Sequence, residues 1–239
     1  MTVTATQGGS TANGMALRVF VLTGAAAAAS QTGASTNNQF TNSASFTQAI
    51  TTTAGSNVYG GSVHNNSGNA ATGSNATIVD DIADATNGER YVTFKALNVT
   101  GGATTRGYTV TTSTGPFAQQ EILASGTLAE DASSPAVAST TAATTVTTAS
   151  FTPPGGSLLV AIVASDGGAT VTTMTVSGGG LSWTEKVKNN PSGGDYAGVW
   201  IADGPAAITS GPALSLPSLR NFPVLMVTRS GWQNAGHSV

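Results

Sequence analysis

Cysteine, charge and long apolar runs are all scarce in this chain. It contains no cysteine, which excludes a disulfide framework and a thiolate metal site. Charged residues make up 8% of its 239 positions, against about 25% in an average soluble protein. The longest apolar run, Leu158–Ala164, is too short to span a bilayer. Thr, Ser, Ala and Gly fill the positions that charged residues usually hold.

The scarcity of charge also limits the partners. The eight basic residues form no cluster and the formal net charge is −3, so the chain lacks the electrostatic footprint of a nucleic-acid-binding protein. The N-terminus has neither a basic region nor an apolar segment of the kind found in signal peptides. We therefore expect neither a nucleic-acid partner nor a membrane partner.

What the chain does have is strand-forming sequence. Its many Thr and Val residues favour pleated strands, and its 30 glycines follow no collagen-like triplet. Val92, Phe94 and Ala96 alternate with more polar neighbours, as in a half-buried strand. Several short strands with Gly and Pro turns between them are typical of a β-sandwich or jelly roll. We predict an all-β fold.

A repeat of about one hundred residues organises the chain. Ser45-Phe46-Thr47 recurs as Ser150-Phe151-Thr152, at an offset of 105. The same offset relates further pairs: Gly88 and Gly193, Tyr91 and Tyr196, Phe94 and Val199, Phe117 and Phe222, Ile122 and Val227. So many matches at one offset indicate an internal duplication.

The repeat predicts two tandem, related β-sandwich modules of jelly-roll or immunoglobulin-like type. They cover residues 31–128 and 129–239, after an N-terminal arm and strand at residues 1–30. The strand Leu17–Gly24 resembles the closing strand of each copy, so we expect it to complete or bridge a sandwich. The arm at residues 1–13 is expected to be ordered only in a larger assembly. Residues 128–148 are predicted to be a linker that becomes the first strand of the second module.

Apolar periodicity also predicts the core. Leu158–Ala164 is apolar at every position, which suits a central strand covered on both faces. Leu181 and Trp183 are expected on one face of a short strand. The predicted core residues are Leu159, Ile162, Trp183, Val199, Ile201 and Val227.

Residues able to carry catalysis are few. The two histidines, His64 and His237, have no spaced carboxylate or second histidine near them, so we expect solvated loop residues rather than a metal pair. A Ser-His-Asp triad assembles only in space, but the sequence has no Gly-X-Ser-X-Gly elbow. Glu185, Asp195 and Asp203 are isolated and nominate no glycosidase pair. We predict no catalytic residue, no cofactor and no enzymatic activity.

One acidic group and one set of aromatic residues leave alternatives open. Asp80, Asp81 and Asp84, with Asn75, offer oxygen ligands for calcium, but they lack the spacing of an EF-hand. The alternative is a strand edge or turn whose charges oppose sheet-to-sheet aggregation. The aromatic residues are candidates for either a sugar-stacking platform or core packing: Trp183, Tyr196, Trp200 and Trp232. The Gly-rich run Ser177–Gly180 is expected to be a turn.

Four sequence runs carry a family resemblance: residues 15–25, 150–160, 180–186 and 196–202. Together they resemble β-sandwich modules in the tail and capsid-surface proteins of tailed phages that infect actinobacteria. The first copy departs from this pattern, with Gln48-Ala49-Ile50 where the second has Pro-Pro-Gly. The resembling motifs are structural and imply no catalytic residue.

The resemblance implies a virion protein that contacts phage capsid or tail proteins and forms a homo-oligomer in the particle. Two functions compete. The first is a structural component, either a minor capsid protein that decorates the shell or a tail protein. The second is a module at the virion surface that binds a receptor or a glycan. The copy number in the particle distinguishes them, because a decoration protein is present in hundreds of copies.

Overall fold

Strands account for nearly all the regular structure, which confirms the all-β prediction. The computed structural model describes residues 1–9, 14–166, 171–191 and 194–206. A single turn of 3-10 helix, η1 (Ala28–Ser30), is the only helical element in these ranges. The strands are β1 (Val3–Gly8), β2 (Met15–Ala25), β3 (Ser35–Thr52), β4 (Asn57–Asn65), β5 (Thr72–Ser74), β6 (Thr77–Asp84), β7 (Glu89–Ala96), β8 (Gly102–Ile122), β9 (Ala124–Glu130), β10 (Ala138–Thr140), β11 (Thr145–Thr147), β12 (Leu158–Ser165), β13 (Thr173–Gly178), β14 (Thr184–Asn189) and β15 (Tyr196–Asp203).

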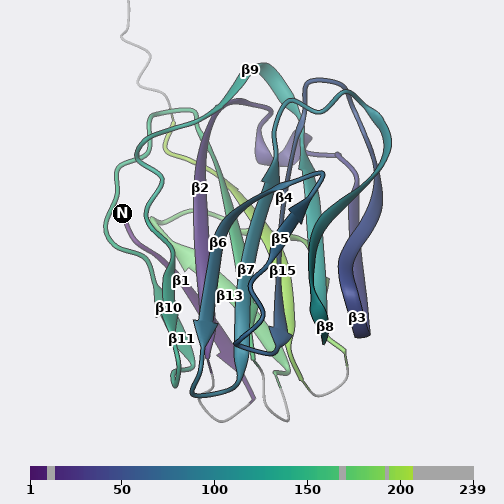
Figure 1. Cartoon of the computed structure of the whole chain (residues 1–239). Coiled ribbons are helices and arrows are strands. Elements are labelled where there is room, and N and C mark those ends of the chain that lie inside the picture. The colour runs from purple at the N-terminus through teal and green to yellow at the C-terminus, as the bar shows by residue number, and fades with distance from the viewer. Residues whose placement is uncertain (10–13, 167–170, 192–193, 207–239) are drawn as a thin grey trace, which may run out of the picture. The chain divides into compact units, whose positions relative to one another are not determined.

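These strands form three antiparallel sheets (Figure 1). Sheet A has the order β11-β1-β13. Sheet B has the order β10-β2-β12-β15-β14, and β9 also pairs with β2. Sheet C has the order β3-β8-β4-β7-β6, and β5 also pairs with β8.

Sheet B lies between the other two. On one face Leu17, Leu159 and Val163 pack with sheet A residues such as Val3 and Val176. On the other face, Phe20 and Ile162 pack with residues of sheet C that include Tyr59 and Ile122. Strand β12 is consequently buried at every position, as its unbroken apolar sequence predicts.

The N-terminal strands are part of the core. Strand β2 lies between β10 and β12 and pairs with β12 from Met15 to Leu22, so the strand predicted at Leu17–Gly24 does complete a sheet. The expectation that the arm is ordered only in an assembly is wrong for Val3–Gly8. These residues form the middle strand of sheet A, because alternate side chains are buried and both strand edges are paired. Residues 10–13 lie outside the described ranges.

The prediction of two tandem sandwiches is not confirmed. Residues 1–207 pack as one unit, and β1 and β2 pair with strands from beyond residue 137. The predicted boundary between residues 128 and 129 falls within β9, which pairs with β2. Two separate sandwiches would each have a core of their own. Here sheet B contributes side chains to the core on both of its faces.

Traces of the repeat are nevertheless visible in the sheets. Tyr91 and Phe94 lie on β7, and their matches Tyr196 and Val199 lie on β15. The order β8-β4-β7-β6 in sheet C parallels β2-β12-β15-β14 in sheet B, with β2 in the place of a closing strand. The match at Phe46 and Phe151 is not structural, because only Phe46 lies in a strand. Phe222, Val227 and the other matches beyond residue 206 lie outside the described ranges, so the duplication stays a prediction.

The predicted core is largely confirmed. Leu159, Ile162, Val199 and Ile201 are at most 1% exposed. Trp183 is only partly buried, and Val227 lies outside the described ranges. The short strand expected at Leu181 and Trp183 is wrong, since β14 begins after them, at Thr184.

The predicted linker differs in detail. Residues 128–148 contain no long first strand. They form the end of β9 and the short strands β10 and β11, which pair with β2 and β1. Strands β1 and β2 thus occupy the sheet positions in which we expected the first strand of the second module.

Candidate functional site

The expectation of a solvated loop histidine is wrong for His64. This residue lies on β4, pairs with Arg90 of β7 and is fully buried. Its ring contacts Phe46 and Tyr108 at centroid distances of 5.7 and 5.9 Å. Burial is the main cause that lowers the pKa of His64 to about 4, so the imidazole is neutral at pH 7. His237 lies outside the described ranges.

His64 has a serine beside it. Its Nδ1 is 3.3 Å from Oγ of Ser113, and that hydroxyl donates to the carbonyl of Asn65 at 2.8 Å. Ser113 is 4% exposed and sits on β8. Because both side chains are buried, this serine–histidine pair joins β4 to β8 and does not face a substrate cleft.

The three aspartates of the predicted calcium group are held apart. Asp80 accepts from Thr93 and pairs with Arg18 at 3.6 Å, while Asp81 pairs with Arg90. Asp84 accepts from the backbone N–H of Thr86 at 3.1 Å and so closes the turn after β6. Strand β6 is an edge of sheet C, as the alternative interpretation predicts.

Asn75, the fourth candidate ligand, instead donates to the carbonyl of Thr105 at 2.9 Å. Within the described ranges, no three acidic or histidine side chains are placed to hold a metal ion. In the structure, Asp80 and Asp81 therefore form ion pairs, and Asp84 closes a turn.

A second acidic group was not predicted. Glu89, at the start of β7, is 8% exposed, and its Oε2 has no hydrogen-bond partner in the described part of the chain. Burial, followed by the charges of Asp195, Asp166 and Asp84, raises the pKa of Glu89 to about 8. Its carboxyl group is therefore largely protonated at neutral pH. No sequence motif marks this group, because Asp166 and Asp195 are far in sequence from the hairpin that holds Asp84 and Glu89.

The predicted aromatic platform is mostly core packing. Tyr196 is 1% exposed, and Trp200 donates from Nε1 to the Tyr196 hydroxyl at 3.1 Å. That hydroxyl donates to Oε2 of Glu185 at 3.3 Å. Trp183 and Trp200 remain partly buried against the core between sheets A and B. Trp232 lies outside the described ranges.

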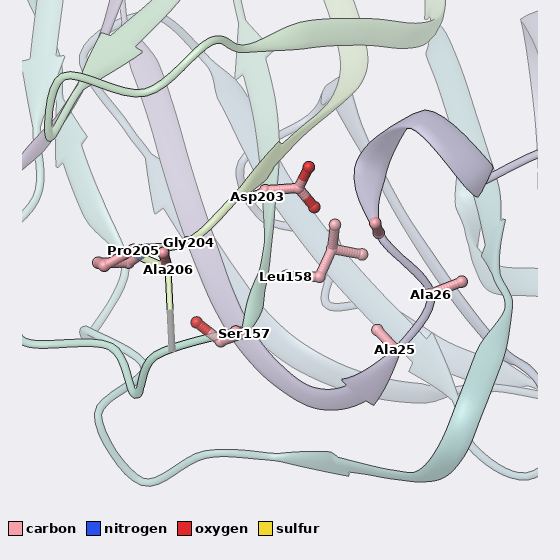
Figure 2. A pocket seen from close by; sticks show the side chains of 10 residues that line it. Ala25, Ala26, Ser157, Leu158, Asp203, Gly204, Pro205 and Ala206 are labelled. Carbon is pink, nitrogen blue, oxygen red and sulfur yellow. The ribbon is translucent and has the colours of Figure 1, made fainter. Parts of the chain in front are cut away.

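A cavity of about 380 Å³ lies where η1 approaches the end of β15 (Figure 2). Its walls are mostly small side chains, including Ala25, Ala26, Ser157 and Gly204. The one carboxylate, on Asp203, accepts from the backbone N–H of Ala28 at 2.7 Å. The cavity therefore offers apolar surface and a carboxylate that is already engaged.

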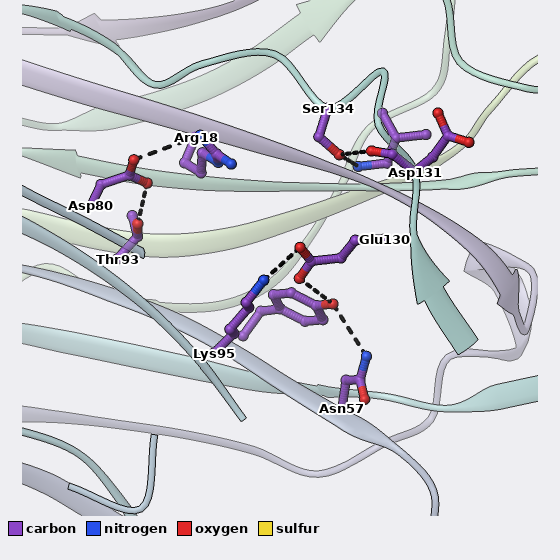
Figure 3. A network of polar contacts seen from close by, with 10 residues as sticks. Arg18, Asn57, Asp80, Thr93, Lys95, Glu130, Asp131 and Ser134 are labelled. Carbon is purple, nitrogen blue, oxygen red and sulfur yellow. Dashed lines mark hydrogen bonds and ion pairs between the residues drawn. The ribbon is translucent and has the colours of Figure 1, made fainter. Parts of the chain in front are cut away.

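Polar contacts join sheet C to β2 and to the segment after β8 (Figure 3). Lys95 of β7 pairs with Glu130 of β9 at 2.6 Å. Tyr59 of β4 donates to the same carboxylate at 3.1 Å, and burial raises the pKa of its phenol. Together with the Arg18–Asp80 pair, these contacts fix the orientation of sheets B and C.

The basic residues of the described ranges form internal contacts of this kind. In the described ranges every lysine and arginine has an acidic partner or a backbone carbonyl partner. These residues are Arg18, Arg90, Lys95, Arg106, Lys186 and Lys188. A partner therefore meets few basic groups that are not already engaged.

Three comparisons were made with known proteins. No family model, no curated protein and no solved structure matches this chain. In addition, no helix in the described ranges is long and apolar enough to cross a membrane.

Proposed function

We propose that this chain is a non-enzymatic structural protein of a tailed-phage particle, located on the capsid surface or in the tail. The observation that carries the proposal is where the resembling sequence runs lie. Residues 15–25 form β2, and the other three runs contribute to β12, β14 and β15. These are the neighbouring strands β2-β12-β15-β14 of sheet B. The resembling runs thus lie in, or directly before, four neighbouring strands of one sheet.

The composition of the surface supports a role in assembly. In the described ranges, exposed strand positions carry mainly Ser, Thr, Asn and Ala, and the basic groups are paired within the chain. Binding through such a surface relies on shape, small apolar area and backbone hydrogen bonds. Those are the contacts expected between protein subunits of a shell or a tail.

The proposal is tested on purified particles of the phage that encodes the chain. Quantitative mass spectrometry against the major capsid protein gives the copy number. We expect the chain to be present, in hundreds of copies for a decoration protein or in few for a tail protein. Its absence from purified particles would contradict the proposal.

A second function is favoured by one observation. Trp183 and Trp200 are partly buried rather than fully enclosed, and Glu185 lies beside Tyr196. Aromatic rings and carboxylates are groups with which proteins stack on and bond to sugars. The alternative is a receptor- or glycan-binding module at the virion surface. The control is Leu97→Ala, because Leu97 is an exposed large apolar residue outside this group. A saturable glycan-array signal that Trp200→Ala abolishes and Leu97→Ala preserves would replace the structural role with this one.

A further inference from the structure

Strand β3 leaves a long sheet edge open. It forms the outer strand of sheet C and pairs only with β8 among the described residues (Figure 1). It runs for 18 residues, from Ser35 to Thr52. In an antiparallel ladder, alternate residues of an edge strand direct their N–H and C=O groups away from the sheet. Ser45 is an exception, because Oγ of Ser43 contacts both its N–H and its C=O. Among the described residues, the other outward groups of the strand's second half are available to another strand.

The outer strands β6 and β14 carry the usual protection against such pairing. Strand β6 carries Asp80, Asp81 and Asp84 in 8 residues, with a register irregularity between Ile78 and Asp80. Strand β14 has Glu185, Lys186 and Lys188 in 6 residues, with an irregularity after Glu185. Charges and bulges at sheet edges oppose edge-to-edge association. The other outer strands, β5, β9, β10, β11 and β13, have at most 7 residues.

Strand β3 has no comparable charge. Its sequence contains no charged residue, no proline and no glycine. Irregularities around Asn42 divide it, but the run from Ser45 to Thr52 pairs residue by residue with β8. Along this run Phe46 and Ile50 are buried, whereas Ala49 and Thr51 are exposed. The result is a regular, neutral edge with one face already packed.

We propose that the run Ser45–Thr52 pairs antiparallel with the same run of a second copy of this chain. A two-fold axis between the copies would join the two C sheets into one continuous sheet. This pairing goes beyond the proposed function, since it is a property of the isolated chain.

A second copy fits this edge better than a charged partner does. The edge has no charge with which to select a partner of opposite sign. Two identical neutral strands also bring no like charges face to face. Neutral residues already meet in this way within the chain. Oγ1 of Thr4 and Oγ1 of Thr147 lie 2.9 Å apart across the antiparallel strands β1 and β11. A two-fold pair is closed, so it covers both edges and stops further growth.

The first test measures the mass of the full chain by sedimentation over a range of concentrations. We expect a monomer–dimer equilibrium. The double variant Ala49→Lys/Thr51→Lys places like charges across the two-fold axis and should raise the dissociation constant by about tenfold or more. The control is Thr184→Lys, an exposed position on the charged edge strand β14, and should leave the dissociation constant unchanged. Circular dichroism checks that all variants fold.

The second test uses the absence of cysteine from the chain. Single spin labels are attached to Ala49→Cys and, separately, to Thr51→Cys, and the distance between the two copies is measured by electron paramagnetic resonance. In a two-fold antiparallel pair, a shift of two residues on one side of the axis changes the label separation along the strands by roughly 13 Å, whereas an axis at Ile50 makes the separations at 49 and 51 equal and short. The control label, at Thr184→Cys on β14, should give a separation that does not fit this pairing of the two β3 strands.

Two results would overturn the pairing. One is a monomer at every concentration. The other is a dimer that the β3 lysines do not weaken. Neither result depends on whether the chain occurs in a phage particle, so the failure of the pairing and the failure of the proposed function are distinguishable.

Discussion

At the residue scale, strand β12 makes the sharpest stability prediction. Leu159 faces sheet A and Ile162 faces sheet C, and neither is more than 1% exposed. Truncating either residue to Ala removes buried methyl groups and leaves a cavity, at a cost of about 2–5 kcal/mol. Urea unfolding measures this cost. A loss below about 1 kcal/mol would show that β12 is not the central strand of the core.

Glu89 gives the protein a pH dependence on the alkaline side. Its folded-state pKa of about 8 lies above the ordinary value of 4.5. Between these two values the folded chain holds a proton that the unfolded chain lacks, so stability falls as the pH rises through this window. Between pH 6.5 and pH 8 we expect a loss of about 1–2 kcal/mol.

The matched variant is Glu89→Gln, which keeps the neutral shape of the side chain and removes the titration. Urea unfolding of both proteins at the two pH values gives the comparison. His64, whose pKa burial lowers to about 4, is present in both proteins, so its own contribution cancels in the comparison. If wild type and variant lose equal stability over this range, Glu89 is not protonated in the folded protein.

At the scale of elements, the contact between sheets B and C depends on a missing side chain. A Cβ on Gly61 of β4 would overlap Cγ2 of Ile162 on β12. Gly61→Val should therefore push the sheets apart and cost about 1–3 kcal/mol, as overpacking usually does. Gly126→Val is the control, since a Cβ there meets nothing within 4 Å. Equal melting temperatures for the two variants would contradict close packing at Gly61.

The sequence predicts some elements well and others poorly, for physical reasons. The apolar run that became β12 and the alternation around Phe94 that became β7 are strong local signals, and both strands form as expected. Strand β3 has a weak local signal because Ser, Thr and Asn fill most of its positions. Its structure depends on pairing with β8, which is distant in sequence.

Sites were harder to predict than strands. Asp80, Asp81 and Asp84 are adjacent in sequence, yet each meets different partners because a strand alternates its faces. The acidic surroundings of Glu89 come together only in three dimensions. His64 looked like a loop residue because a turn follows it, but β4 extends to Asn65 and buries the ring.

At the scale of the whole molecule, the N-terminal strands connect the sheets in the described part of the chain. Strands β1 and β2 supply the middle of sheet A and a central strand of sheet B. The tandem repeat in the sequence favoured two independent sandwiches. Sequence similarity shows which segments are alike, but it does not show which strand fills a given place in a sheet. Here β2 holds a place in sheet B comparable to that of β8 in sheet C.

We propose that the chain is a structural part of a phage particle, held there by shape, small apolar area and backbone hydrogen bonds. Purified particles are washed in rising salt and, separately, in rising denaturant, and the released chain is quantified by mass spectrometry. Salt screens charge interactions, and the basic groups in the described part of the chain have internal partners. We therefore expect retention in salt and release only in denaturant. Complete release by moderate salt alone would show that charge holds the chain in the particle, and would contradict this account.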